Sequence, residues 1–317
     1  MSNVSSIAYL FPGQGSQSIG MLADLAESFE SIGNTFERAS SVLGFDLWNL
    51  IQKGEASELD LTQNAQPALL SSSFALWQVC QELGKVRPSI MAGHSLGEWS
   101  ALVCAGVIEF ETAVELVHLR GKYMQEALPA GEGSMAAIIG LEDALVEECC
   151  EAARNEGWVE AANFNSPGQV VIAGHMTALA KACELAKERG AKMAKVLSVS
   201  APFHTKLMRP AADKLAPHIQ NAKFKMPEIP VVHNVGNVIE GDVENIKKLL
   251  IEQIYSPVRW VGCLEVISDK GCETLIECGP GKVLSGLAKR INRSLKALPS
   301  DSPVNIDALP AAVEQAV

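Results

Sequence analysis

The alternation of short apolar segments with helical segments constrains the fold of this chain more than any other feature. Apolar runs bounded by glycine or proline predict four strands outside the middle of the chain, at 6–11, 90–92, 229–234 and 274–277. Helical periodicity fills the intervals between them. Strands that alternate with helices form a mostly parallel sheet, because a parallel connection needs a crossover that is usually a helix. We therefore predict an α/β fold with one mostly parallel sheet built from both ends of the chain.

The middle of the chain, between 133 and 199, follows a different order. Its apolar and helical segments read β-α-β-β-α-β, which is typical of a ferredoxin-like unit. We therefore expect a large domain of residues 1–130 and 200–298 and an inserted ferredoxin-like domain at 131–199. The stretch 299–317 has three prolines and no aromatic residue, so we expect a poorly ordered tail there.

Composition excludes several classes of partner. The 317 residues carry 26 basic and 37 acidic side chains, a net charge of −11 with both signs interspersed. This argues against binding to nucleic acid or to an anionic membrane. The charge-free run 61–81 contains many polar residues and Pro67, which excludes a transmembrane helix. The eight cysteines form no C-x-x-C pair and the apolar run at 7–11 is too short for a signal peptide, so we expect a cytoplasmic protein. We also expect a monomer.

The strongest local motif is Gly93-His94-Ser95-Leu96-Gly97, a G-x-S-x-G pattern. It follows a predicted strand and precedes a predicted helix, which is the context of a nucleophile elbow. There the glycines allow a sharp turn and the serine hydroxyl stands at the end of the strand. Ser95 is therefore a candidate nucleophile. The alternative is an ordinary strand-to-helix turn in which Ser95 only caps the helix.

A serine nucleophile needs a base, and the chain has six histidines. His204 lies where the inserted segment rejoins the large domain and a helix begins, a position that can face a cleft between domains. It is the best candidate base, against the alternative of a solvent-facing histidine at a helix start. His94 adjoins the nucleophile, so we expect its side chain to point away from the turn and either to serve packing or to support another residue of the site.

Arg120 interrupts an apolar stripe. On the predicted helix 109–128, the residues at the spacing of one face are apolar except at this position. A buried guanidinium needs an anionic or polar partner, because an unpaired buried charge costs several kcal/mol. Either an internal carboxylate or a ligand supplies that partner. The alternative is that the long side chain extends past the apolar face and keeps its charge in solvent. The glycine motifs around Gly13 and Gly281 lack the further residues of nucleotide-binding loops, and no metal-ligand spacing occurs.

These residues belong to longer stretches that match a known family. The chain resembles the malonyl-CoA:acyl carrier protein transacylases of bacterial fatty-acid synthesis, from residue 6 to about residue 293. The resemblance implies an α/β-hydrolase-like large domain that carries an inserted ferredoxin-like domain. The matching stretches are 11–17 (FPGQGSQ), 93–102 (GHSLGEWSAL), 120–125 (RGKYMQ), 163–169 (NFNSPGQ), 201–204 (APFH) and 277–281 (ECGPG).

The resemblance also implies a reaction. Ser95 would be the nucleophile and His204 the base, and Arg120 would bind the malonyl carboxylate. The malonyl group would pass from malonyl-CoA to Ser95 and then to the phosphopantetheine thiol of acyl carrier protein, in a ping-pong sequence with no cofactor or metal bound to this chain.

Supporting roles are implied as well. The main-chain N–H groups of Gln14 and Leu96 would form the oxyanion hole, and the carbonyl of Gln253 would hold the histidine. Gln14 and Asn165 would also contact the substrate.

Three alternatives remain open. A discrete polyketide-type acyltransferase would share every motif. A thioesterase would use water in place of the carrier thiol. An inactive scaffold would only bind carrier proteins, although intact Ser95, His204 and Arg120 argue against it.

Carrier proteins of this pathway are generally acidic, so docking on a chain with net charge −11 needs a local basic patch. Two groups of cations are candidates. The first, patch A, is Lys187, Arg189, Lys192 and Lys195. The second, patch B, is Lys289, Arg290 and Arg293.

Overall fold

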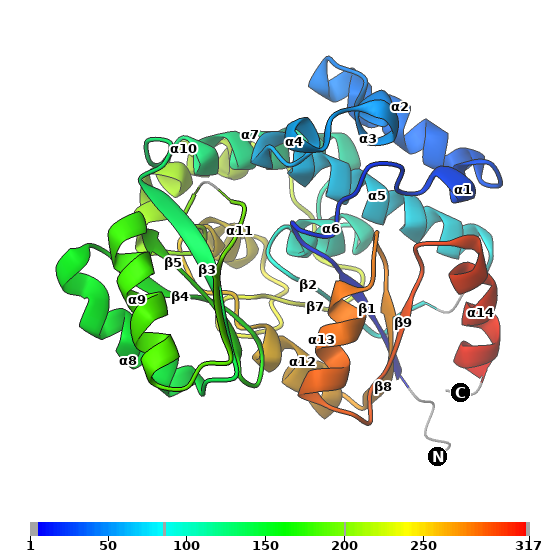
Figure 1. Ribbon diagram of the computed structural model, residues 1–317. Coiled ribbons are helices and arrows are strands. Elements are labelled where there is room, and N and C mark those ends of the chain that lie inside the picture. The colour runs from blue at the N-terminus through cyan, green and yellow to red at the C-terminus, as the bar shows by residue number, and fades with distance from the viewer. Residues whose placement is uncertain (1–5, 85–86, 200, 315–317) are drawn as a thin grey trace.

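The computed structural model describes residues 6–84, 87–199 and 201–314 and contains two separate sheets (Figure 1). The larger sheet has the strand order β7-β2-β1-β8-β9, and all of its strand pairs are parallel. The smaller sheet has the order β4-β5-β3-β6, and all of its pairs are antiparallel.

The larger sheet is built from both ends of the chain. Its strands are β1 (Ser6–Phe11), β2 (Ile90–Gly93), β7 (Val231–Val232), β8 (Cys272–Glu277) and β9 (Lys296–Pro299). Alternate residues of β1 enter two different cores. Tyr9 and Phe11 pack with the helices on one face, and Ala8 and Leu10 pack on the other. Both faces are therefore covered, as expected for a parallel sheet.

Helices α5, α6 and α7 contribute to the first of these cores, and α12 and α13 to the second. No helix that the structure describes is long and apolar enough to span a bilayer. The helices are α1 (Ala23–Ala26), α2 (Glu30–Leu43), α3 (Leu47–Lys53), α4 (Ala56–Leu59), α5 (Thr62–Glu82), α6 (Leu96–Cys104), α7 (Phe110–Gln125), α8 (Asp143–Ala153), α9 (Met176–Glu188), α10 (Arg209–Asn221), α11 (Val243–Gln253), α12 (Trp260–Asp269), α13 (Val283–Ile291) and α14 (Pro303–Glu314), with 3-10 turns η1 (Arg154–Glu156) and η2 (Lys206–Met208).

The smaller sheet consists of β3 (Gly133–Ile139), β4 (Val159–Ser166), β5 (Gln169–His175) and β6 (Met193–Val196). Helices α8 and α9 cover its outer face (Figure 1) and form a core of their own with residues such as Ala136 and Ile138. Met135 and Val171 point the other way and join the core of the large sheet. The small sheet is thus a wall shared with the rest of the molecule.

The predicted fold class is confirmed: a parallel α/β sheet is interrupted by a β-α-β-β-α-β unit with the strand order of a ferredoxin-like sheet. Over residues 299–314 the expectation of a poorly ordered tail is wrong, and the last three residues of that stretch, 315–317, lie outside the described part of the chain. Residues 296–299 form β9, which pairs with β8, and α14 follows with Ile306 and Leu309 buried. Two of the prolines mark element boundaries, because Pro299 ends β9 and Pro303 opens α14, where a missing N–H costs little.

Helix α5 begins earlier than its sequence suggests. Proline is common in the first turn of a helix, so Pro67 predicts a start at that residue. The helix instead begins at Thr62 and contains Pro67. Proline has no N–H to donate to the carbonyl four residues earlier, which is that of Gln63. The ring of His118 on α7 contacts this carbonyl through Nδ1 at 2.9 Å and so satisfies it.

Candidate active site

Ser95 occupies a strained turn at the carboxyl end of β2. Its backbone has φ 52° and ψ −107°, a conformation that non-glycine residues rarely adopt. A side chain at Gly93 would collide with the backbone of Gly97, and one at Gly97 would collide with the carbonyl of Phe11. Both glycines are therefore required by close backbone approach. The turn directs the Ser95 hydroxyl out of the sheet, as the nucleophile-elbow prediction requires.

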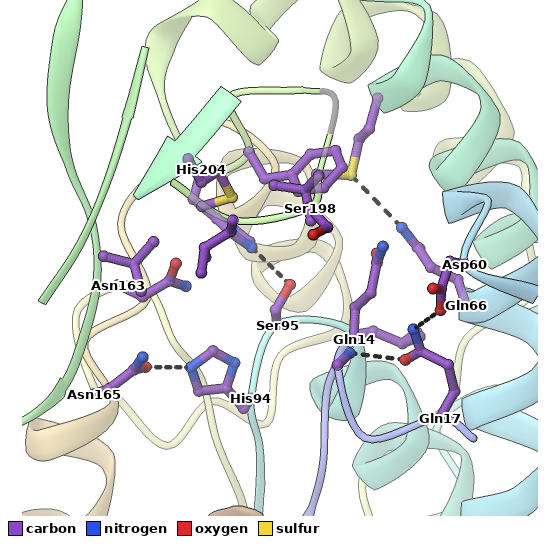
Figure 2. Close-up of a pocket in the computed structure, with 18 of the residues that line it drawn as sticks. Gln14, Gln17, Asp60, Gln66, His94, Ser95, Asn163, Asn165, Ser198 and His204 are labelled. Carbon is purple, nitrogen blue, oxygen red and sulfur yellow. Dashed lines mark hydrogen bonds between the residues drawn. The ribbon is translucent and has the colours of Figure 1, made fainter. Parts of the chain in front are cut away.

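The structure brings Ser95 and His204 together. The Ser95 Oγ lies 2.6 Å from the His204 Nε2 (Figure 2), and the His204 Nδ1 lies 2.9 Å from the main-chain oxygen of Gln253. Because a carbonyl only accepts, Nδ1 carries the proton and Nε2 is free to accept the hydroxyl proton. Burial, with the nearby Arg120 as a second cause, lowers the pKa of His204 to about 3. The imidazole is therefore neutral at physiological pH, the state that a general base needs.

Arg120 is 1% exposed, and its guanidinium reaches the same hydroxyl. It donates to the Oε1 of Gln66 at 2.8 Å, to the Oε1 of Gln253 at 3.0 Å and to the Ser95 Oγ at 3.2 Å. Its Nε–H has no hydrogen-bond partner among the described residues. Burial lowers the pKa of Arg120 to about 10, so the group stays charged at neutral pH. None of the three acceptors is a carboxylate, and a cation thus stands beside the candidate nucleophile with neutral partners only.

The remaining predicted site residues line the same cavity. Gln14 lines the cavity together with Ser95, and Leu96 follows Ser95 as the first residue of α6, where the N–H has no acceptor within the helix. The Oδ1 of Asn165 is 2.8 Å from the Nε2 of His94 (Figure 2). His94 therefore also lines the cavity, and its contact with Asn165 agrees with the expected role of supporting another residue of the site.

The cavity has a volume of about 520 Å³ and lies between the carboxyl end of the large sheet and the small sheet. One part of its wall is polar and surrounds Ser95, whereas the other is apolar and comes mainly from the inserted unit. The lining residues are Gln14, Gly15, Gln17, Asp60, Gln66, His94, Ser95, Leu96, Arg120, Met124, Met135, Asn163, Asn165, Val171, Leu197, Ser198, Val199, Phe203 and His204. Across the described parts of the chain, no group of His, Cys, Asp or Glu side chains is arranged to hold a metal.

Sequence reasoning missed three residues that organise this site. Gln66 holds Arg120, and the side chain of Asn234 accepts the N–H of Ser95 at 2.8 Å and donates to the carbonyl of Gly93 at 2.8 Å. Glu98, three residues after Ser95, is a buried carboxylate at the end of this network. A charged residue among the apolar positions of α6 was the available signal for Glu98, whereas Gln66 and Asn234 gave none.

Comparison with known proteins places this geometry in a family. The model of the acyl transferase domain matches residues 8–295. The malonyl CoA-acyl carrier protein transacylase of Salmonella typhimurium is 52% identical over 305 residues, covering 96% of this chain and 99% of the relative. The crystal structure of an acyl carrier protein S-malonyltransferase from Vibrio cholerae superposes with a TM-score of 0.94 at 53% identity, over 96% of this chain and 100% of that one.

A second solved structure contains a partner. It is a malonyl-transacylase in complex with its type II PKS acyl-carrier protein, and it is similar to this chain with a TM-score of 0.95 and 50% identity, over 98% of this chain and 100% of that one. The identities and the coverage far exceed what a shared fold alone produces. The chain belongs to the acyl transferase family and, within it, to the malonyl CoA-acyl carrier protein transacylases.

Proposed function

We propose that this protein transfers the malonyl group from malonyl-CoA to the phosphopantetheine thiol of acyl carrier protein, for fatty-acid synthesis. The observation that carries the proposal is the contact of Ser95 with both a neutral imidazole and a buried guanidinium. The imidazole serves acyl transfer in general, and the guanidinium serves an acyl group that ends in a carboxylate. The names of the relatives support the same reaction.

In the first half-reaction, Ser95 Oγ attacks the thioester carbon of malonyl-CoA while His204 Nε2 takes the hydroxyl proton. The main-chain N–H groups of Leu96 and Gln14 stabilise the oxyanion of the tetrahedral intermediate. The carbon–sulfur bond then breaks, and His204 returns its proton to the CoA sulfur. The carbonyl of Gln253 stabilises the protonated imidazole through Nδ1 throughout.

The second half-reaction runs the same steps with another thiol. His204 takes the proton of the carrier's phosphopantetheine thiol, the sulfur attacks the malonyl ester, and Ser95 Oγ recovers the proton. We propose that the chain itself binds no cofactor, because the only prosthetic group in this scheme arrives on the carrier. We also propose that the reaction takes place in the cytoplasm, which the free state of all eight buried cysteines supports.

Arg120 makes the site selective in this proposal. A carboxylate at the far end of the acyl group accepts hydrogen bonds from the guanidinium, whereas an acetyl group offers it nothing. The Asn165 amide, whose oxygen is occupied by His94, contributes to the wall of the acyl pocket rather than to the reaction. A thioesterase would pass the acyl group to water instead of to a thiol, and the relatives, which are named transacylases and S-malonyltransferases, favour the thiol acceptor.

We propose patch A as the carrier-docking surface. All four of its cations are exposed, and they lie at the end of α9 and along β6. The chain runs from β6 directly into Leu197, Ser198 and Val199, which line the active-site cavity. A carrier bound there would have a short path for its phosphopantetheine arm. Patch B, around the end of α13, is also exposed but contributes no residue to the cavity.

One experiment tests the proposed function directly. The purified protein is incubated with labelled malonyl-CoA, and the label is located by peptide mapping before and after holo acyl carrier protein is added. We expect label on Ser95 that moves to the carrier, and a slow loss to water without a carrier. Absence of label from Ser95, or rapid hydrolysis without an acceptor thiol, would rule the proposal out. Comparing carrier proteins from fatty-acid synthesis and from polyketide synthesis in the same assay distinguishes the proposed function from that of a polyketide-type acyltransferase.

A further inference from the structure

Glu98 is a fully buried carboxylate that touches none of the reacting atoms. It lies in the first turn of α6 and is 1% exposed. Its Oε1 is 2.7 Å from the Nδ1 of His233, and its Oε2 accepts the N–H of Asn234 and the Nε2 of Gln253, both at 2.8 Å. Such a group is costly to bury, so its hydrogen bonds must compensate for the lost hydration.

The bond to Gln253 determines which way that amide faces. The Gln253 Nε2 donates to Glu98 Oε2 and to the Ser95 carbonyl at 3.0 Å, and both of these atoms can only accept. The Gln253 Oε1 is thereby directed at the Nη2 of Arg120, which can only donate. A flipped amide would set an oxygen against the carboxylate and N–H groups against the guanidinium. Glu98 therefore makes the flipped arrangement unfavourable at both ends.

Glu98 is separated from Arg120 only by the side-chain amide of Gln253, which binds both groups. Its negative charge is close enough to raise the pKa of Arg120 against the effect of burial. The carboxylate nevertheless does not bind the guanidinium, because Gln253 lies between them. The cation is stabilised without being paired, and its remaining N–H groups stay available to a ligand.

We infer that Glu98 is a positioning residue for selectivity: by orienting the Gln253 amide, it keeps Arg120 placed and unpaired for the terminal carboxylate of the acyl group. The inference rests on the proposed function. It predicts that loss of the Glu98 acceptor damages recognition of malonyl more than it damages acyl transfer in general.

The test compares acylation of Ser95 by malonyl-CoA and by acetyl-CoA in matched variants. Glu98→Met removes the acceptor at similar volume, and we expect the malonyl-to-acetyl ratio of kcat/KM to fall roughly tenfold, the value of one hydrogen bond to a charged network. Glu98→Gln keeps an oxygen for Gln253, while His233 can accept from the new amide, so it should restore most of the ratio. Glu277→Met is the control, because Glu277 is another buried carboxylate but binds the N–H groups of Leu284 and Ser285 on α13.

A merely structural role would lower both rates equally and leave the ratio unchanged, as we expect for Glu277→Met. An unchanged ratio in Glu98→Met would overturn the inference. It would also be overturned if Glu98→Met lowered the ratio as much in a protein that already carries Arg120→Ala as it does in the wild type. If Glu98→Met does not fold, Glu98→Asp, which withdraws the carboxylate by one methylene, replaces it. An unchanged ratio in that variant likewise refutes the inference. Failure of the proposed function is a separate result, seen as absence of malonyl-Ser95 in the wild type.

Discussion

Replacing Arg120 with alanine should convert a malonyl-selective site into one that no longer distinguishes malonyl from acetyl. The substitution removes the guanidinium that contacts Ser95 Oγ, Gln66 and Gln253. Malonyl then loses its cationic partner, whereas an acetyl group has no such partner to lose, and the lost contact with Ser95 affects both substrates alike. The candidate nucleophile and base are left in place, because Ser95 and His204 contact each other directly.

The structure sets the size of the effect. A charge-assisted hydrogen bond is worth about 1.5–3 kcal/mol, or about 10- to 100-fold in rate. The interaction energy of an exposed ion pair is smaller than this because water screens the charges. Arg120 is only 1% exposed, so this screening does not reduce its interaction with a bound carboxylate. Two N–H groups that bind one carboxylate together act cooperatively. We therefore expect the malonyl-to-acetyl ratio to fall by about 100-fold.

The assay is single-turnover acylation of Ser95 by each CoA thioester, followed by mass spectrometry of the intact protein. The ratio of the two rates is insensitive to the folded fraction, which matters because Arg120→Ala leaves a cavity. Arg120→Lys serves as the comparison, since it keeps the charge but loses the planar fork, and it should give an intermediate ratio. A ratio within about twofold of the wild type in Arg120→Ala would refute the assigned role.

Four further predictions concern the base, the pH dependence of stability, the turn and the docking surface. Because the pKa of His204 is lowered to about 3, acylation should persist well below pH 6.5, and the acid limb should move to higher pH in Arg120→Ala; an acid limb near pH 6.5 in the wild type would contradict this. Because of the same shift, His204 takes up a proton below about pH 6.5 in the unfolded chain but stays neutral in the folded protein. The urea midpoint of unfolding should therefore fall as the pH decreases below about 6.5, and it should fall less in His204→Gln. Gly97→Ala should abolish acylation and lower the melting temperature, because the new methyl group meets the Phe11 carbonyl; wild-type acylation would disprove the need for close approach. The double substitution Lys192→Glu and Lys195→Glu should raise the KM for the carrier without changing acylation by malonyl-CoA, and an unchanged KM would move the docking surface to patch B.

The elements of the fold that follow local rules could be predicted from the sequence. The strand at 6–11, the turn at Ser95 and the β-α-β-β-α-β order depend on apolar periodicity and glycine placement, which act over a few residues. Predictions failed where a distant partner decides the outcome. Pro67 lies inside α5 because His118 satisfies the carbonyl that proline leaves free. The C-terminal strand forms because β8 offers a free edge to Leu298.

The candidate site divides in the same way. Ser95, His204 and Arg120 stood out in the sequence, because a nucleophile elbow, a histidine at a junction and a cation on an apolar face are local patterns. Gln66 and Asn234 did not, because a neutral amide is ordinary until its partners are known.

The sequence by itself determined that Ser95 would stand at the end of a strand and that Arg120 would be buried. The glycines around Ser95 and the apolar residues on the same helix face as Arg120 are close to them in the chain, so both features follow from local sequence. Only the tertiary structure decided that this cation faces two amide oxygens and a hydroxyl instead of a carboxylate. The physical reason is that hydrogen-bond partners and electrostatic fields depend on distances through space. Here they join residues from α5, α6, α7 and the end of α11 that lie far apart along the chain.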